Sequence, residues 1–184
     1  MIQFLDSVIS IHSLIWLFPV VFMIHDFEEM IRIEPWFRKH HDYLFAKVPA
    51  RFHKDLRWLS RITAPQFSVA VCLEFIIFIP CTFLAAEMEN YLWFLGFNSI
   101  LLLHVFMHLG QALYVKKLVP GVVTAAGVTL PYTVYLFYRL LSENVVEVSD
   151  IFTSVAFGVT LVPIVVFGHW LGEKLVPAAN GASR

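Results

Sequence analysis

The sequence predicts an all-α protein, a polytopic membrane bundle of five transmembrane helices. Composition is the first reason, because 59% of the 184 residues are hydrophobic, 16% are aromatic and only 15% are charged, which is unlike an average soluble domain. Length is the second, because apolar stretches of the roughly 20 residues that cross a bilayer recur along the chain. The third is that these stretches lack the regular alternation of apolar and polar residues found in membrane β-barrel strands.

Five apolar stretches account for most of the chain. They lie near 8–31, 66–86, 91–115, 119–141 and 149–172. Four of them contain a proline, which a membrane helix tolerates because neighbouring helices can satisfy the carbonyl group that the proline frees; these are Pro19, Pro80, Pro131 and Pro163. No internal repeat or low-complexity segment divides the chain, so we expect one integral membrane domain over 1–184, with a short frayed tail at 177–184.

Charged residues at the ends of these stretches predict the orientation. The first is followed by Arg32, Arg38, Lys39, Lys47, Arg51, Lys54, Arg57 and Arg61, the third ends at Lys116 and Lys117, and the fifth ends at Lys174. The second and fourth lead instead to acidic segments, with Glu87 and Glu89 in one and Glu143, Glu147 and Asp150 near the single Arg139 in the other. Lys and Arg collect on the cytoplasmic side, so the N-terminus is predicted to lie outside the cell membrane and the C-terminus in the cytoplasm.

The basic cytoplasmic loop 32–65 is also rich in aromatic residues. It could include an amphipathic helix lying on the anionic inner leaflet, or it could be a plain loop with interfacial aromatic side chains. The net charge of the chain is -1, and its basic residues are concentrated in this loop rather than spread over a domain surface. Membrane lipids are therefore the expected surroundings, and nucleic acid is not an expected partner.

Ionisable residues inside the predicted spans converge in depth. At ~1.5 Å per residue, His25 lies ~10 Å inside Arg32, His108 and His104 lie ~12 Å and ~18 Å inside Lys116, His169 lies ~8 Å inside Lys174, and Glu74 lies ~14 Å beyond Pro65. Such residues usually face the interior of a bundle, where they pair with one another or line a functional cavity. We therefore expect one polar site in the cytoplasmic half of the membrane.

Helical spacing indicates what this site could bind. His25 shares a face with Glu28 at i, i+3 and with Glu29 at i, i+4, and in "LLHVFMHLGQ" the i, i+4 pair His104 and His108 shares a stripe with Gln111. Imidazole and carboxylate groups suit zinc, iron or manganese, and helical bundles build metal sites from inward-facing Glu and Glu-x-x-His ligands. We predict a divalent metal site, with zinc favoured over iron, and its ligands are His25, Glu28, His104, His108 and His169.

Two further carboxylates are predicted to act in acid–base chemistry. Glu29 is the candidate base, and Glu74 in "VCLEFIIFIP" is a lone carboxylate that requires a partner or a proton inside an apolar span. Glu28 and Glu29 lie on opposite sides of His25, at about -60° and +40°, so their roles as ligand and base could be exchanged.

Asp26 points ~100° away from His25 and is left outside the site. Asn98 and Gln111 are expected to support the ligands. The number of candidate ligands also leaves a dinuclear site open.

Each pattern has a structural alternative. His25 and its acidic neighbours are also what a helix end at the lipid headgroups would contain, because charges are tolerated there. The pair His104 and His108 could serve hydrogen bonding between helices. The evidence for a site is therefore the shared depth of these residues more than any one motif.

The motif "HDFEE" at 25–29 resembles the signature of the HXXEE-motif family of small multi-pass membrane proteins. The later segments "NSILLLHVFMH" and "YVKKLVPG" resemble that family's third span and the Pro-Gly turn that follows it. The resemblance covers the first span through the fourth. It implies a membrane metal-dependent enzyme in which the matching positions are His25, Glu28, Glu29, His104 and His108.

Three functions fit these observations. In the first, histidines and one glutamate bind an ion that activates water, and the other glutamate accepts a proton during hydrolysis of a lipid or another apolar substrate at the cytoplasmic leaflet. In the second, two irons oxidise an apolar substrate, although membrane desaturases and hydroxylases use more histidines than the four buried here. In the third, the cluster binds or conducts a metal or protons without turnover. Hydrolysis is the favoured prediction.

Overall fold

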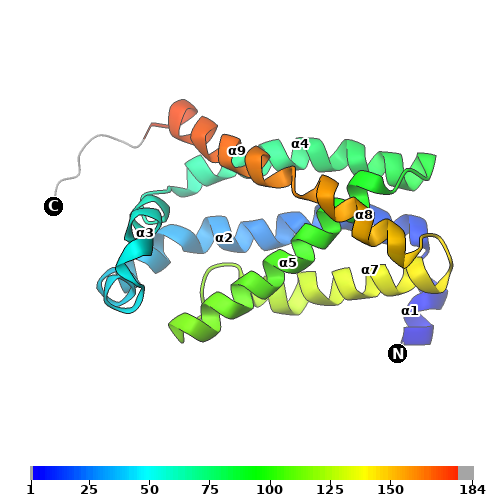
Figure 1. The fold of residues 1–184 in the computed structure, drawn as a ribbon, viewed down its shortest axis with the longest axis horizontal. Coiled ribbons are helices and arrows are strands. Elements are labelled where there is room, and N and C mark those ends of the chain that lie inside the picture. Colours follow the sequence, from blue (N-terminus) through cyan, green and yellow to red (C-terminus); the bar gives the residue numbers. More distant parts are fainter. Residues whose placement is uncertain (1, 178–184) are drawn as a thin grey trace.

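The chain runs back and forth along one axis as a bundle of helices (Figure 1). A computed structural model describes residues 2–177, and that part of the chain contains no β-strand. In chain order the elements are α1 (Ile2–Val8), α2 (Ile11–Lys47), the 3-10 turn η1 (Ala50–Phe52), α3 (His53–Leu59), α4 (Ala64–Met88), α5 (Leu92–Val115), α6 (Val122–Thr124), the π-helix η2 (Ala125–Thr129), α7 (Leu130–Ser142), α8 (Val148–Gly158) and α9 (Leu161–Leu175). The all-α prediction is confirmed, and the predicted tail from residue 178 onwards lies outside the described residues.

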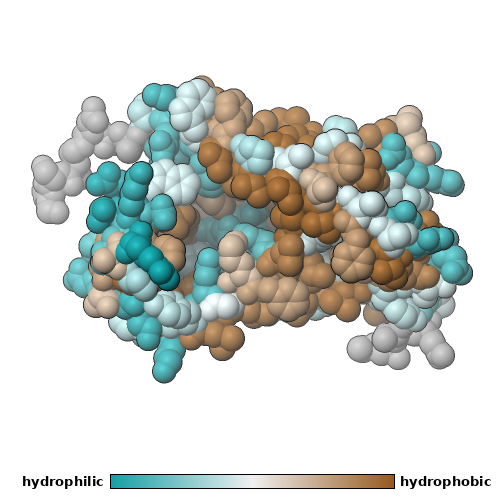
Figure 2. Space-filling model, in the orientation of Figure 1, coloured by the Kyte–Doolittle hydropathy of each residue, from teal (hydrophilic) through white to brown (hydrophobic). Residues whose placement is uncertain are grey.

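Three helical stretches are long and apolar enough to cross a membrane. They are Ala64–Met88, Leu92–Val115 and Val148–Leu175, and they coincide with the second, third and fifth predicted spans. Figure 2 shows hydrophobic side chains over the middle of the molecule and hydrophilic ones gathered at both ends. These features are typical of a helical membrane protein.

The other two predicted spans differ from the structure. Helix α2 begins only after Ser10, whose hydroxyl oxygen accepts a hydrogen bond from the backbone N–H of Ser13 at 3.1 Å. It then continues through Pro35 to Lys47, so the first part of the predicted loop 32–65 is helical and the rest contains η1 and α3. The predicted span 119–141 starts with a turn at Gly121, and the helical run that follows from 122 to 142 contains the π-helix η2 between α6 and α7.

Local sequence signals define the ends of α4 and α5. At the start of α4, the hydroxyl of Thr63 accepts from the backbone of Gln66, and the side chain of Gln66 accepts from the backbone of Thr63. This reciprocal cap satisfies two N–H groups that a helix start otherwise leaves free. Glu89 and Lys116 end the two helices in left-handed conformations, with φ of 53° and 55°. The chain thus reverses between α4 and α5.

An aromatic cluster forms the core in the middle of the bundle. The ring centroid of Phe78 lies 4.8 Å from that of Phe18, 4.7 Å from that of Phe22 and 5.1 Å from that of Phe97. Phe18 also meets Phe94 edge to face at 5.6 Å. Helices α2, α4 and α5 are therefore joined by one set of packed rings.

The helix faces that form this core continue into a polar cluster. On α2, the stripe of Phe18 and Phe22 leads at helical spacing to His25 and Glu29. On α5, the stripe of Phe97 and Leu101 leads in the same way to the two histidines of "HVFMH". Core packing of α2 on α5 thereby determines which polar side chains face each other near the end of the molecule that carries α3.

Close helix contacts depend on glycine. A Cβ atom at Gly158 of α8 would clash with the carbonyl group of Gly96 on α5 and would lie 2.8 Å from Cγ1 of Ile100, so α5 and α8 approach with little between their backbones. Gly168 of α9 packs in the same way on Ala70 of α4. Because α8 lies on α5 and α9 lies on α4, α5 and α9 diverge toward the α3 end (Figure 1).

Candidate metal centre

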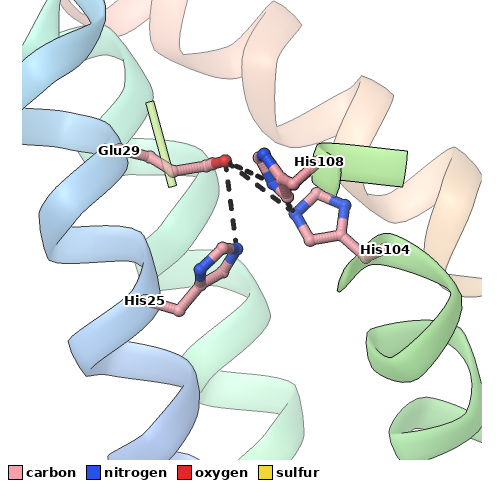
Figure 3. Close-up of side chains that lie close together, drawn as sticks. All are labelled: His25, Glu29, His104 and His108. Atoms are coloured by element: carbon pink, nitrogen blue, oxygen red, sulfur yellow. Dashed lines mark hydrogen bonds and ion pairs between the residues drawn. The ribbon is translucent and has the colours of Figure 1, made fainter. Parts of the chain in front are cut away.

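Four side chains converge between α2 and α5 (Figure 3): His25 and Glu29 from α2, and His104 and His108 from α5. One donor atom from each lies within 4.8 Å of the other three. The Nε2 atom of His108 is 2.8 Å from Oε1 of Glu29 and 2.8 Å from Nε2 of His104. The Nε2 atoms of His25 and His104 are each 3.9 Å from Oε1 of Glu29. This buried cluster could hold a metal ion.

The spacing of the donor atoms agrees with a tetrahedral site. An ion bound at about 2.0–2.1 Å by four ligands separates any two of them by about 3.3 Å, and the distances above lie on both sides of that value. Three imidazole nitrogens and one carboxylate oxygen are also a donor set that zinc and similar ions accept. The residues present therefore fit a divalent transition metal.

Thr124 determines which nitrogen of His25 faces the cluster. The Thr124 hydroxyl lies 3.1 Å from Nδ1 of His25 and donates to Oε2 of Glu28 at 2.7 Å. An ionised carboxylate only accepts hydrogen bonds, so the single hydroxyl proton is used there and the Thr124 oxygen accepts from Nδ1–H of His25. The Nε2 atom then carries a free lone pair, and it is buried with no hydrogen-bond partner among residues 2–177. A buried lone pair that meets no donor from the chain and lies beside three other potential ligands favours a bound cation.

Glu28 supports this arrangement from outside the cluster. Its Oε1 accepts from Arg32 at 2.6 Å, and its Oε2 accepts from both the backbone N–H and the hydroxyl of Thr124 at 2.7 Å. Both oxygens are therefore engaged, and the structure differs from the prediction that Glu28 is a ligand. Glu29 takes the position among the donors, while Glu28 orients His25 through Thr124, as carboxylates commonly do for metal-binding histidines.

The turn after α5 presses its backbone against the cluster. Gly121 has a φ of 80°, and a Cβ atom there would lie 2.6 Å from Oε1 of Glu29 and 2.8 Å from Cε1 of His108. Only glycine combines that left-handed conformation with so close an approach. Sequence reasoning missed Gly121 and Thr124 as site residues; the "VPG" turn was a signal for a reversal of the chain, but not for its contact with α2.

The cluster lies on the wall of a cavity of about 950 Å³, which is near the upper end of the range for small-molecule sites. All four cluster residues line it. Figure 2 shows this face of the molecule hollowed between α5 and α9, with hydrophilic side chains visible inside. The candidate metal centre is thus accessible from a large and mainly apolar space.

The remaining predicted site residues are placed differently. Glu74 and Gln111 line the same cavity outside the four-residue cluster. His169 also lines it, but its ring packs against those of Trp58 and Phe67, with centroids 5.4 Å and 5.2 Å away. Asn98 does not line the cavity; it is buried and donates to the backbone carbonyl of Phe94 at 2.9 Å. Among the described residues, Asn98 therefore makes no hydrogen bond to a predicted ligand, contrary to the expectation that it supports the ligands.

Asp26 is the clearest difference from the sequence-based expectation. It was left outside the site as a residue of a helix end, yet only 6% of it is exposed and it lines the cavity. Its Oδ2 atom has no hydrogen-bond partner within the described part of the chain. The reason is that α2 packs on α4 as well as on α5, so the side of α2 turned away from His25 is covered by protein.

The fold and the cluster together define an all-α protein that has three helical stretches suited to crossing a membrane and a buried histidine–glutamate site that could bind a metal ion. Residues 16–136, more than half of the chain, match the family described as proteins of unknown function with an HXXEE motif, and the chain belongs to this family. Here the motif is His25, Glu28 and Glu29. No curated protein and no solved structure matches the chain.

Proposed function

We propose that the protein is a metal-dependent membrane hydrolase that acts on a lipid or another apolar substrate at the cytoplasmic leaflet of the cell membrane. His25, His104 and His108 would hold one divalent ion, zinc first, and Glu29 would accept a proton beside it. The observation that carries the proposal is the convergence of these four donors, without a Lys or Arg partner in the described structure, on the wall of a 950 Å³ cavity.

The chain's own groups would divide the work as follows. When bound, a divalent ion supplies Lewis-acid activation of water and of a carbonyl or phosphoryl oxygen. Glu29 lies 2.8 Å from Nε2 of His108 and faces the cavity, so it could take the proton of an attacking water. Thr124 and Glu28 keep the Nε2 atom of His25 unprotonated. Glu74 on α4 lines the same cavity and is the candidate to give a proton to the leaving group.

The surroundings favour an apolar substrate. Most side chains that line the cavity are aliphatic or aromatic, and in such surroundings the interactions of the few polar groups are stronger than in water. The basic residues gather in the second half of α2, in the segment that follows it and at the ends of α5 and α9, which supports a cytoplasmic location for this end by the positive-inside rule. A substrate would then reach the cluster from the inner leaflet.

Metal analysis of protein purified in detergent tests the proposal. We expect zinc at close to one equivalent, and His108→Ala should abolish that metal content. His12→Ala is the matched control, because His12 contacts Glu87 instead of the cluster. Protein that contains no metal and binds none on titration would exclude the proposed hydrolase.

The variant Glu29→Gln separates a base from a ligand. If Glu29 accepts the proton, the variant should keep its metal and lose activity on long-chain ester and amide substrates by a factor on the order of 10²–10⁴. Fatty acid release would be measured next to the metal content. Loss of metal equal to that of His108→Ala would make Glu29 a ligand.

One observation favours a di-iron oxidase as the second candidate. Asp26 and Glu74 bring two further carboxylates to the same cavity as Glu29, and di-iron proteins use several carboxylates together with histidine. Two equivalents of iron and an iron optical spectrum in the purified protein would support this alternative over the zinc hydrolase.

A further inference from the structure

We infer that the substrate is an uncharged long-chain molecule whose reacting ester or amide lies between two apolar parts, and that it enters sideways between α5 and α9. This inference rests on the proposed hydrolase function. Three features of the cavity carry it: the placement of its polar residues, the signs of its charges and the position of its opening.

The polar residues of the cavity form a belt between two apolar ends. The belt contains the four cluster residues together with Asp26 and Glu74, while Asp55 of α3, Gln111 and His169 are polar lining residues outside it. The end toward the aromatic core is lined by residues such as Phe22, Phe78, Phe97 and Leu161, and the end toward α3 by residues such as Trp36, Leu44, Phe52 and Leu56. A molecule that fills both ends places apolar groups on each side of the cluster. A lipid that carries its polar headgroup at one terminus would instead leave one apolar end of the cavity without an apolar group to fill it.

The charges in the cavity disfavour an anionic substrate. Asp26, Glu29, Asp55 and Glu74 line it, and no Lys or Arg among the described residues does. Apart from the ion of the proposed metal site, a phosphate group in this space would have no cationic partner, and it would meet carboxylates in surroundings of low dielectric constant. An uncharged ester or amide avoids that cost.

Two helix edges form the sides of an opening. Leu103 and Met107 on α5 line the cavity and yet are 57% and 50% exposed. On α9, Val162 and Val166 line it and are 54% and 62% exposed. Each pair is spaced i, i+4, so each forms an apolar edge along its helix, and the side chain of His104 between the first pair is 31% exposed. The cluster is therefore reached from the lipid-facing side of the bundle.

The α3 end of the cavity is partly covered by protein. Leu44 near the end of α2, Leu56 of α3 and Val115 at the end of α5 pack into a second apolar cluster, and the hydroxyl of Tyr43 donates to the carbonyl of Val115 at 2.7 Å. Phe52 and Tyr114 at this end also line the cavity and are 46% and 50% exposed, so the cover is partial. The gap between α5 and α9 is the opening on the lipid-facing side, and an apolar chain would enter there.

Photolabelling tests the inference without requiring a metal or turnover. The probe is a long-chain dialkyl ether, which cannot be hydrolysed, with a diazirine on each chain, added to the protein in phosphatidylcholine vesicles. We expect labelled peptides from both ends of the cavity, namely from α3 and from the segment of α4 or α5 around Phe78 and Phe97. The same ether with a phosphate at the end of one chain should label about tenfold less.

Closing the opening provides the second measurement. The double variant Leu103→Trp/Val166→Trp should reduce labelling by about tenfold. The matched control is Leu113→Trp/Leu175→Trp, at two exposed positions of the same helices that do not line the cavity. Labelling at one end only, equal labelling by the phosphate probe, or full labelling of the closed variant would overturn the inference. Normal labelling of a protein that binds no metal would overturn the hydrolase proposal instead, and leave this one standing as a binding site.

Discussion

Two polar clusters are buried in this apolar bundle, and they are built in opposite ways. Near α1, Arg139 donates to Oε1 of Glu143 at 2.6 Å, to the carbonyl of Ile9 at 2.9 Å and to the hydroxyl of Tyr135 at 2.8 Å, and Tyr135 in turn donates to Asp6 at 2.8 Å. Donors face acceptors and a cation faces carboxylates. No buried side-chain nitrogen or oxygen of this network lacks a hydrogen-bond partner among the described residues.

The cluster near α3 has no Lys or Arg partner among the described residues. Three imidazole nitrogens and one carboxylate oxygen face one another, and Nε2 of His25 has no partner in the described chain. An incomplete set of this kind is costly in an apolar interior unless something outside the chain completes it. The difference indicates that the Arg139 network serves the fold, whereas the histidine cluster could bind an ion.

The largest effect on metal binding is expected from Gly121→Ala. The added methyl group would need the space of the Glu29 carboxylate and the His108 ring, and the left-handed conformation adds further strain. We expect metal binding to fall to background, measured by elemental analysis after purification. Gly110→Ala and Gly127→Ala are matched controls, because a Cβ atom there meets nothing within 4 Å. Wild-type metal content in Gly121→Ala would show that this close approach does not shape the site.

A smaller effect on metal binding is expected from Thr124→Val. The change keeps the shape of the side chain but removes the acceptor for Nδ1–H of His25 and one donor to Glu28. Loss of such a supporting group typically weakens metal affinity by about 10–100-fold, which zinc titration with a competing chelator would measure. Thr82→Val is the control, because the buried hydroxyl of Thr82 donates only to a carbonyl of its own helix. If both variants bind zinc equally well, the role assigned to Thr124 is wrong.

The smallest effect on metal binding, and a clear effect on stability, is expected from Arg139→Gln. Loss of a buried charged hydrogen-bonding group costs about 2 kcal/mol, or about 4–8 °C in melting temperature for a chain of this size. Thermal unfolding in detergent, followed beside metal content, would test this. Arg61→Gln replaces an exposed arginine and should change neither quantity. Metal loss in Arg139→Gln would mean that the two clusters are coupled.

Several features of the fold were predictable because they depend on short-range sequence properties. The stretches Ala64–Met88, Leu92–Val115 and Val148–Leu175 follow from length and hydropathy. The pairs His25 with Glu29 and His104 with His108 follow from helical periodicity alone. The division of 119–141 was not predictable from hydropathy, because an apolar composition does not distinguish one long helix from a π-helix flanked by shorter ones.

The sequence by itself determined that the chain is helical, that it suits a membrane and that two chelating pairs lie on two helices. Only the tertiary structure decided that these pairs face each other, that Glu29 and not Glu28 joins them, and that Asp26 is buried beside them. It also decided that Gly121 and Thr124, more than 90 positions away from α2's motif in chain order, complete the site. The physical reason is that helical periodicity sets directions within one helix, while the rotation of that helix against its neighbours depends on the packing of the whole bundle.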